Sequence, residues 1–122
     1  MSEYVGLNIR PVVVNPVVDA ASDTDYVFVV KDAADEELDL SDCTAKMQLR
    51  PYPGATRLYD ELTTENGRLE ITGGRINIYF PHEVTDLYTF AQAVYDLYVY
   101  IESGEQYRVA QGTVQVHKGV TR

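Results

Sequence analysis

The stretch "AVYDLYVYIESGEQYRV", residues 93–109, decides the fold because apolar side chains alternate with polar or tyrosine side chains around a turn sequence. A period of two is typical of a β-strand with one buried face. A three-residue loop at residues 103–105 predicts a hairpin that pairs Ile101 with Tyr107. The predicted inner face consists of Tyr95, Leu97, Val99, Ile101 and Tyr107.

The opposite face of this hairpin carries the residues that we expect to meet a partner. Its members are Asp96, Tyr98, Tyr100, Arg108 and Ala110. Arg108 lies opposite Tyr100 in the predicted register and can stack on its ring. Outward tyrosines beside an arginine are typical of protein interfaces. Two alternatives stay open: ordinary pairing on a solvated sheet, or stacking on sugars, although sugar sites usually add tryptophan and this chain has none.

Two further features of the hairpin suggest the type of sandwich. The apolar parity changes after Gln111, which predicts a β-bulge at Gln111-Gly112 that returns Val114 and Val116 to the core. Tyr95, in "AVYDL", resembles the tyrosine corner of immunoglobulin-like sandwiches, with Leu97 at the cysteine position. An ordinary inward tyrosine is the alternative interpretation.

Other parts of the chain repeat the strand pattern, with turn signals about every 8–12 residues, as in sandwiches and barrels. The segment "DYVFVVK", residues 25–31, is apolar on both faces and is predicted to be a central strand. Turns at Asn66-Gly67 and Gly73-Gly74 predict a three-stranded meander over about residues 57–80 that pairs Leu62 with Ile71 and Ile71 with Ile76. Residues 81–88 predict one helical turn, with His82 on the surface.

Pro11 and Pro16 make residues 1–18 an expected edge strand or an arm that reaches a neighbouring subunit. Arg10, Val12 and Val14 are therefore added to Tyr98, Tyr100 and Arg108 as candidate partner contacts. Glu3 and Pro11 do not suit a secretory signal, so synthesis in a cytoplasm is expected.

Composition bounds the function. The chain has 122 residues, enough for the single domain that we expect over residues 1–122, and its net charge of −9 argues against nucleic acid and membrane partners. Cys43 is the only cysteine, so no internal disulfide forms. No catalytic motif is visible, and we expect neither enzymatic activity nor a cofactor. Residues 32–42 are acidic enough for calcium but lack the EF-hand order, which favours a solvated loop.

Three longer segments resemble the small virion proteins of tailed bacteriophages: residues 38–71, residues 74–87 ("GRINIYFPHEVTDL") and residues 93–122. Their motifs include "TTENGRLEI", "YDLYV" and the closing "GTVQVHKGVTR". The chain is similar also to the immunoglobulin-like N-terminal module of phage baseplate upper proteins.

These resemblances imply a non-enzymatic, multi-copy structural protein of the virion that contacts other virion proteins. A tail, baseplate or head-to-tail connector position is the first expectation, and capsid-surface decoration is the second. The fold implied is an all-β, immunoglobulin-like sandwich of about seven to eight antiparallel strands. A carbohydrate-binding module, with a glycan as its partner, is the alternative from another class.

Overall fold

Two β-sheets packed face to face form the protein. The computed structural model describes residues 12–32 and 34–119, and these form nine strands and one short helix. The strands are β1 (Val12–Val13), β2 (Val17–Asp19), β3 (Thr24–Val29), β4 (Thr44–Arg50), β5 (Asp60–Thr63), β6 (Leu69–Thr72), β7 (Arg75–Phe80), β8 (Gln92–Tyr100) and β9 (Gln106–His117), and the helix is α1 (His82–Thr85).

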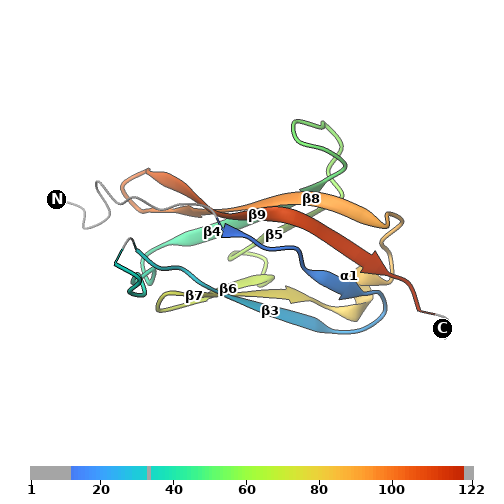
Figure 1. Ribbon diagram of the computed structural model, residues 1–122, viewed down its shortest axis with the longest axis horizontal. Coiled ribbons are helices and arrows are strands. Elements are labelled where there is room, and N and C mark those ends of the chain that lie inside the picture. Colours follow the sequence, from blue (N-terminus) through green and yellow to red (C-terminus); the bar gives the residue numbers. More distant parts are fainter. Residues whose placement is uncertain (1–11, 33, 120–122) are drawn as a thin grey trace.

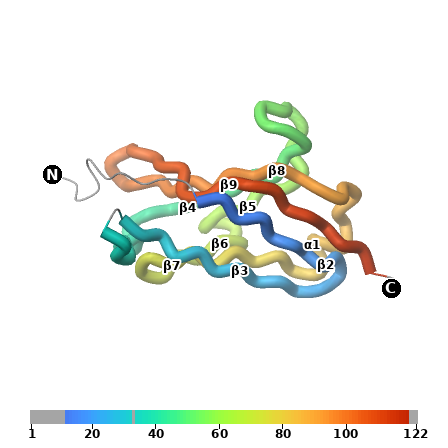
Figure 2. Tube along the Cα trace, viewed as in Figure 1, coloured from blue at the N-terminus to red at the C-terminus, as the bar shows by residue number. Residues whose placement is uncertain are grey.

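The strand order identifies the type of sandwich. One sheet has the order β1-β9-β8-β4-β5, with β2 also on β9, and the other has the order β3-β7-β6. Figure 1 and Figure 2 show β4, β8 and β9 in the upper layer and β3, β6 and β7 in the lower one. In the smaller sheet, β3, β7 and β6 take the places of immunoglobulin strands B, E and D. In the larger sheet, β4, β5, β8 and β9 take those of C, C′, F and G. The expected all-β, immunoglobulin-like sandwich is confirmed.

The core lies between the inner faces of the two sheets. Alternation in β4 buries Ala45, Met47 and Leu49, and Leu97 of β8 is fully buried at the position expected for an immunoglobulin cysteine. Cys43 is also buried.

The described part of the N-terminal segment, β1 and β2, lies at a sheet edge, as expected, but it runs parallel to β9 rather than antiparallel. Val12 pairs with Ala110, and Val18 pairs with Val116. Asn15 separates β1 from β2, and its side-chain Oδ1 accepts a hydrogen bond from the Thr113 amide at 3.0 Å. Parallel pairing needs a long connection between the two strands, and here most of the chain separates them.

The register of the β8–β9 hairpin differs from the prediction. Ile101 bonds to Glu105, with 2.8 Å between its nitrogen and the Glu105 oxygen, so the loop consists of residues 102–104. Gly104 occupies the last loop position with a φ of 102°, the left-handed conformation that three-residue hairpin loops require. The loop therefore begins one residue earlier than predicted, and Tyr107 is only partly buried.

The predicted position of the bulge was also wrong. The register shifts between Leu97 and Tyr98, opposite residues 108–110, rather than at Gln111-Gly112. Ala110 then pairs with Leu97 and is 1% exposed, so it belongs to the core and not to the outer face.

Only half of the predicted meander forms. The β6–β7 register, with Ile71 opposite Ile76, is confirmed. The predicted pairing of Leu62 with Ile71 was wrong, because β5 pairs with β4 and places Leu62 opposite Met47. Asn66 explains the difference: its Oδ1 accepts from the amides of Thr63 and Arg68, both at 3.0 Å, and this turn carries the chain to the other sheet.

Of two other predictions, the helical turn is confirmed and the central position of β3 was wrong. The helical turn is confirmed as α1, and the His82 side chain is exposed, with its Nδ1 2.9 Å from Asp23 Oδ1. The hydrogen bond to Asp23 raises the pKa of His82, and the charge of Glu83 adds to this effect. The segment expected to be central, β3, is instead an edge strand.

Candidate functional site

The outward surface of the β9-β8-β4 strands, here called the outer face, gathers the candidate interface residues of the hairpin. It is formed by Lys46, Gln48 and Arg50 of β4, Val94, Asp96, Tyr98 and Tyr100 of β8, and Arg108, Gln111 and Thr113 of β9. These side chains alternate with the buried ones because successive residues of a strand point to opposite faces of the sheet.

Tyr98 and Tyr100 lie side by side on the outer face. Their ring centroids are 6.4 Å apart, with 27° between the ring planes. Both rings are half-buried. Lys46 Nζ lies 6.0 Å from the centroid of Tyr100. The two rings therefore form one continuous aromatic surface.

Arg108 pairs with Tyr98 and not, as predicted, with Tyr100, because the hairpin loop begins one residue earlier. Its Cζ lies 5.5 Å from the Tyr98 ring centroid. Its Nε and Nη2 donate hydrogen bonds to the Tyr98 hydroxyl at 3.2 Å and 2.9 Å. These bonds raise the pKa of Arg108, to which the charge of Asp96 also contributes.

A groove of about 700 Å³ lies on the outer face, and its lining includes Arg108 but neither Tyr98 nor Tyr100. One wall is Tyr52 with Pro53 and Gly54, from the β4–β5 loop that stands away from the sheet in Figure 1 (green), and the other includes Val13 and Asn15. Between these walls lie the polar side chains of Gln48, Arg50, Asp96, Arg108, Gln111 and Thr113, together with Val94 and Tyr95.

Hydrogen bonds within the molecule hold the β4–β5 wall of this groove in place. Arg50 Nη1 donates to the carbonyl oxygen of Ala55 at 2.9 Å, and Arg50 Nη2 donates to Gln48 Oε1 at 2.8 Å. Gln48 in turn donates to Glu61 at 2.5 Å. The groove therefore has a fixed outline before any ligand arrives.

The three N-terminal candidate residues have different outcomes. Arg10 lies outside the described residues. Val12 is 50% exposed. Val14 is partly buried against the core, and its amide donates to the Gln111 carbonyl at 3.0 Å. Val14 therefore belongs to the sandwich, whereas the side chain of Val12 is open to solvent.

Tyr95 does not form the tyrosine corner that the sequence resembles. Its hydroxyl donates to the Val14 carbonyl at 2.6 Å, 81 residues upstream, rather than to nearby backbone. Burial raises the pKa of Tyr95. The bond ties the N-terminal edge to β8.

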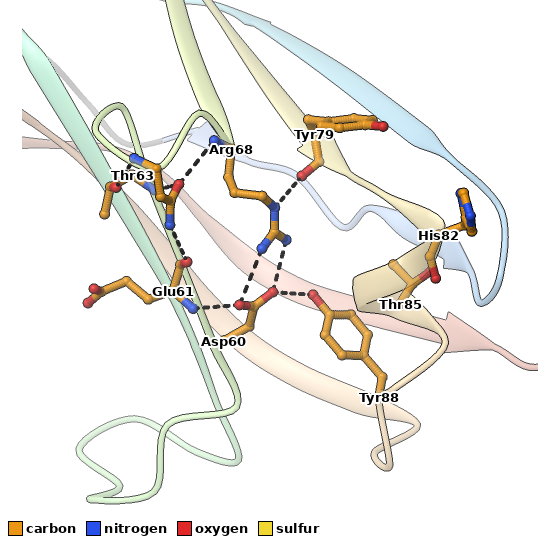
Figure 3. Close-up of polar contacts among 9 residues, drawn as sticks. Asp60, Glu61, Thr63, Arg68, Tyr79, His82, Thr85 and Tyr88 are labelled. Carbon is orange, nitrogen blue, oxygen red and sulfur yellow. Dashed lines mark hydrogen bonds and ion pairs between the residues drawn. The ribbon is translucent and has the colours of Figure 1, made fainter.

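A polar cluster inside the sandwich, formed by Asp60, Arg68 and Tyr88, was missed by sequence analysis (Figure 3). Arg68 Nη2 lies 2.9 Å from Asp60 Oδ2, and the two side chains are 12% and 15% exposed. The Tyr88 hydroxyl donates to the same carboxylate at 2.5 Å, and Arg68 Nε donates to the Tyr79 carbonyl at 2.8 Å.

This cluster joins the two sheets at one side, because Asp60 lies in β5 and Arg68 directly precedes β6. Burial lowers the pKa of Arg68, but the hydrogen bond and charge of Asp60 outweigh this and raise it. Burial, followed by the bond to Asp60, raises the pKa of Tyr88. One sequence signal was available: Asp60 stands two residues before Leu62 and therefore shares its inward parity.

Two carboxylates of the acidic loop accept hydrogen bonds from nearby backbone amides. Asp32 Oδ1 accepts from the amides of Ala34 and Glu36 at 2.8 Å and 3.1 Å. Asp39 accepts from the Ser41 amide, and its hydrogen bonds with Ser41 lower the pKa of Asp39. Across residues 12–32 and 34–119, no group of three or more His, Cys, Asp or Glu side chains is arranged to hold a metal ion. Within the same residues, no helix has the length and apolar character needed to cross a membrane.

Comparison with known proteins finds similar solved structures. No protein-family model and no curated protein matches the chain. It is similar to the crystal structure of Dscam1 isoform 4.44, N-terminal four Ig domains, at 13% identity and a TM-score of 0.41. The match covers 93% of this chain and 25% of that one, so the chain spans about a quarter of the protein that it resembles. The strand order of the two sheets places the chain among the immunoglobulin-like sandwiches.

Proposed function

We propose that the protein is a non-enzymatic structural component of a tailed phage particle. It acts as a multi-copy attachment or adaptor protein of the tail, baseplate or head-to-tail connector, made in the host cytoplasm and resident in the virion. The observation that carries this proposal is the fixed array of Tyr98, Tyr100 and Arg108 on the outer face. The resemblance of residues 38–122 to virion proteins supplies the setting.

The array suits a protein partner for physical reasons. Tyrosine and arginine are enriched among residues that dominate binding energy, since they bury a large area with few rotatable bonds. Stacking and hydrogen bonds already restrict these side chains, so little conformational entropy is lost when a partner docks.

The charged side chains of the outer face limit which partner surface fits the array. The chain has a net charge of −9, yet Lys46, Arg50 and Arg108 all lie on the outer face. Asp96 lies 3.7 Å from Arg108 on the same face, so the partner surface that fits best carries carboxylates opposite the cations and a basic group opposite Asp96.

Co-sedimentation tests the proposal. The purified chain is mixed with particles that lack it, taken from the phage that encodes it, and compared with a Tyr98→Ala, Tyr100→Ala double variant. We expect wild-type protein to bind stoichiometrically and the variant to bind about 1,000-fold more weakly, since each of the two tyrosines typically contributes about 2 kcal/mol.

Tyr79→Ala is the matched control. Tyr79 is a half-buried tyrosine in β7, on the outward surface of the other sheet. It should bind as wild type. Equal binding by the double variant, or no binding by wild-type protein, would contradict the proposal.

Two other functions remain candidates. Decoration of the capsid surface would use the same array and differs in its stoichiometry, which would follow the capsid lattice. Carbohydrate binding is favoured by the groove, where Tyr52, 62% exposed, stands beside polar side chains that include Gln48, Asp96 and Gln111. In that case glycans would change the tyrosine fluorescence of the wild type, and Tyr52→Ala would abolish the change.

A further inference from the structure

The three-stranded sheet ends at an uncovered edge on β3. Among the described residues no strand pairs with β3 on the side away from β7. The N-terminal strands, which could have covered it, pair with β9 in the other sheet. With six residues, β3 is the longest of the described edge strands, since β5 and β6 have four each.

The backbone of β3 presents a regular row of hydrogen-bonding groups on this edge. The Val30 amide donates to the Gly74 carbonyl at 2.8 Å, so Val30 points toward the β7 side. Hydrogen-bonding direction alternates along an antiparallel strand, which turns the amides and carbonyls of Asp25, Val27 and Val29 toward the open edge.

Lys31 continues this row. Lys31 lies opposite Glu37 in an isolated β-bridge. The hydrogen bonds of this bridge join the flanking residues: the Leu38 amide donates to the Val30 carbonyl at 3.0 Å, and the Asp32 amide donates to the Glu36 carbonyl at 2.9 Å. The amide and carbonyl of Lys31 itself therefore point to the same side as those of Val29.

The side chains beside the edge are partly apolar. Val27 is 58% exposed and Val29 is 39% exposed. Natural edge strands are usually protected from pairing by proline, a bulge or a charge within the strand; β3 has neither proline nor bulge from Thr24 to Val29, and its one charge is Asp25.

We propose that the edge of β3 binds the β3 edge of a second copy of this chain. Antiparallel pairing about a two-fold axis at Phe28 sets Val27 opposite Val29 and Asp25 opposite Lys31 of the other copy. Only this register matches the hydrogen-bonding direction, buries the exposed valines against each other and joins opposite charges. By symmetry each of these pairs occurs twice.

The charged residues have only weak contacts to give up. Lys31 Nζ lies 3.5 Å from Asp35, whose side chain is 86% exposed. Asp25 accepts a hydrogen bond from Asn77 at 3.3 Å. Solvated pairs of this kind contribute little to stability and can be exchanged for contacts across the dimer.

Analytical ultracentrifugation from about 10 μM to about 1 mM tests the pairing, because small edge contacts dissociate in this range. Wild-type protein should form a dimer. Asp25→Lys and Lys31→Asp each place like charges opposite one another twice, and each should weaken the dimer about tenfold or more.

An equimolar mixture of these two variants provides the sharpest test. Both charge pairs are again complementary in the mixed dimer, which should form with an affinity near that of wild type. Two variants that ignore each other would overturn the register, and a wild-type chain that stays monomeric at about 1 mM would overturn the proposal.

Backbone pairing is tested by Val27→Pro. Proline removes the amide that points to the open edge and leaves the ladder with β7 intact, so the dimer should be lost while the fold survives by circular dichroism. Val27→Thr keeps the amide and the branched side chain, and this control should remain dimeric. A dimer that survives Val27→Pro would show that another surface is used.

Discussion

Replacing Asp60 by alanine is expected to lower the free energy of unfolding by about 3 kcal/mol. The change leaves the guanidinium of Arg68 without its ionic partner and the Tyr88 hydroxyl without its acceptor, and both side chains are largely shielded from water. A fully buried pair would cost more, but the two charged side chains keep some contact with solvent. Urea unfolding followed by circular dichroism measures the difference.

Glu61→Ala is the matched control for this experiment. Glu61 is the next residue of β5, and its side chain bonds to Gln48 on the outer face. Its loss should cost less than about 1 kcal/mol, as for other solvated polar contacts. Equal losses of unfolding free energy in the two variants would contradict the stabilising role that we assign to the polar cluster of Asp60, Arg68 and Tyr88.

Gly112→Ala is expected to lower Tm by about 10 °C, corresponding to about 3 kcal/mol. A methyl group at this position would lie 2.3 Å from the Val14 carbonyl oxygen and 2.7 Å from Asn15 Oδ1. The φ of 154° is also unfavourable for a residue with a side chain. The segment between β1 and β2 must then move away from β9.

Hydrogen exchange identifies the site of this damage. The amides of Val14 and Thr113, which bond across the gap to Gln111 and Asn15, should lose protection before the amides of β4 do. Gln111→Ala, one residue away on the outer face, is the control and should leave these amides protected. Uniform loss of protection in Gly112→Ala would argue against a local displacement.

Local patterns predicted the strands well, but they did not predict which sheet each strand joins. The register of the β6–β7 hairpin depends only on neighbouring residues and was predicted correctly. The sheet that a strand joins depends on its partner, so β5 was assigned to β6 although it pairs with β4. The side chain of Asn66 decided between these choices, and a two-residue turn and a crossover share the same "NG" sequence.

The candidate site was predicted in outline but not in pairing. Tyr98 and Tyr100 face outward, as expected from parity. Arg108 was assigned to the wrong tyrosine because the loop begins one residue earlier, with Gly104 at its last position, and this shifts the partners on β9 by two residues. The groove depends on a loop, an edge strand and three central strands together, and no single segment of the sequence contains a sign of it.

Parallel pairing of the first and last strands has a mechanical consequence. β1 and β2 run in the same direction as β9 beside it, so the chain enters the sandwich at one end and leaves it at the other (Figure 1). A pulling force applied across these two points acts along the strands and perpendicular to their hydrogen bonds. The bonds between Val12 and Ala110, and onward to Asp19 and His117, are then loaded in shear together rather than opened one after another.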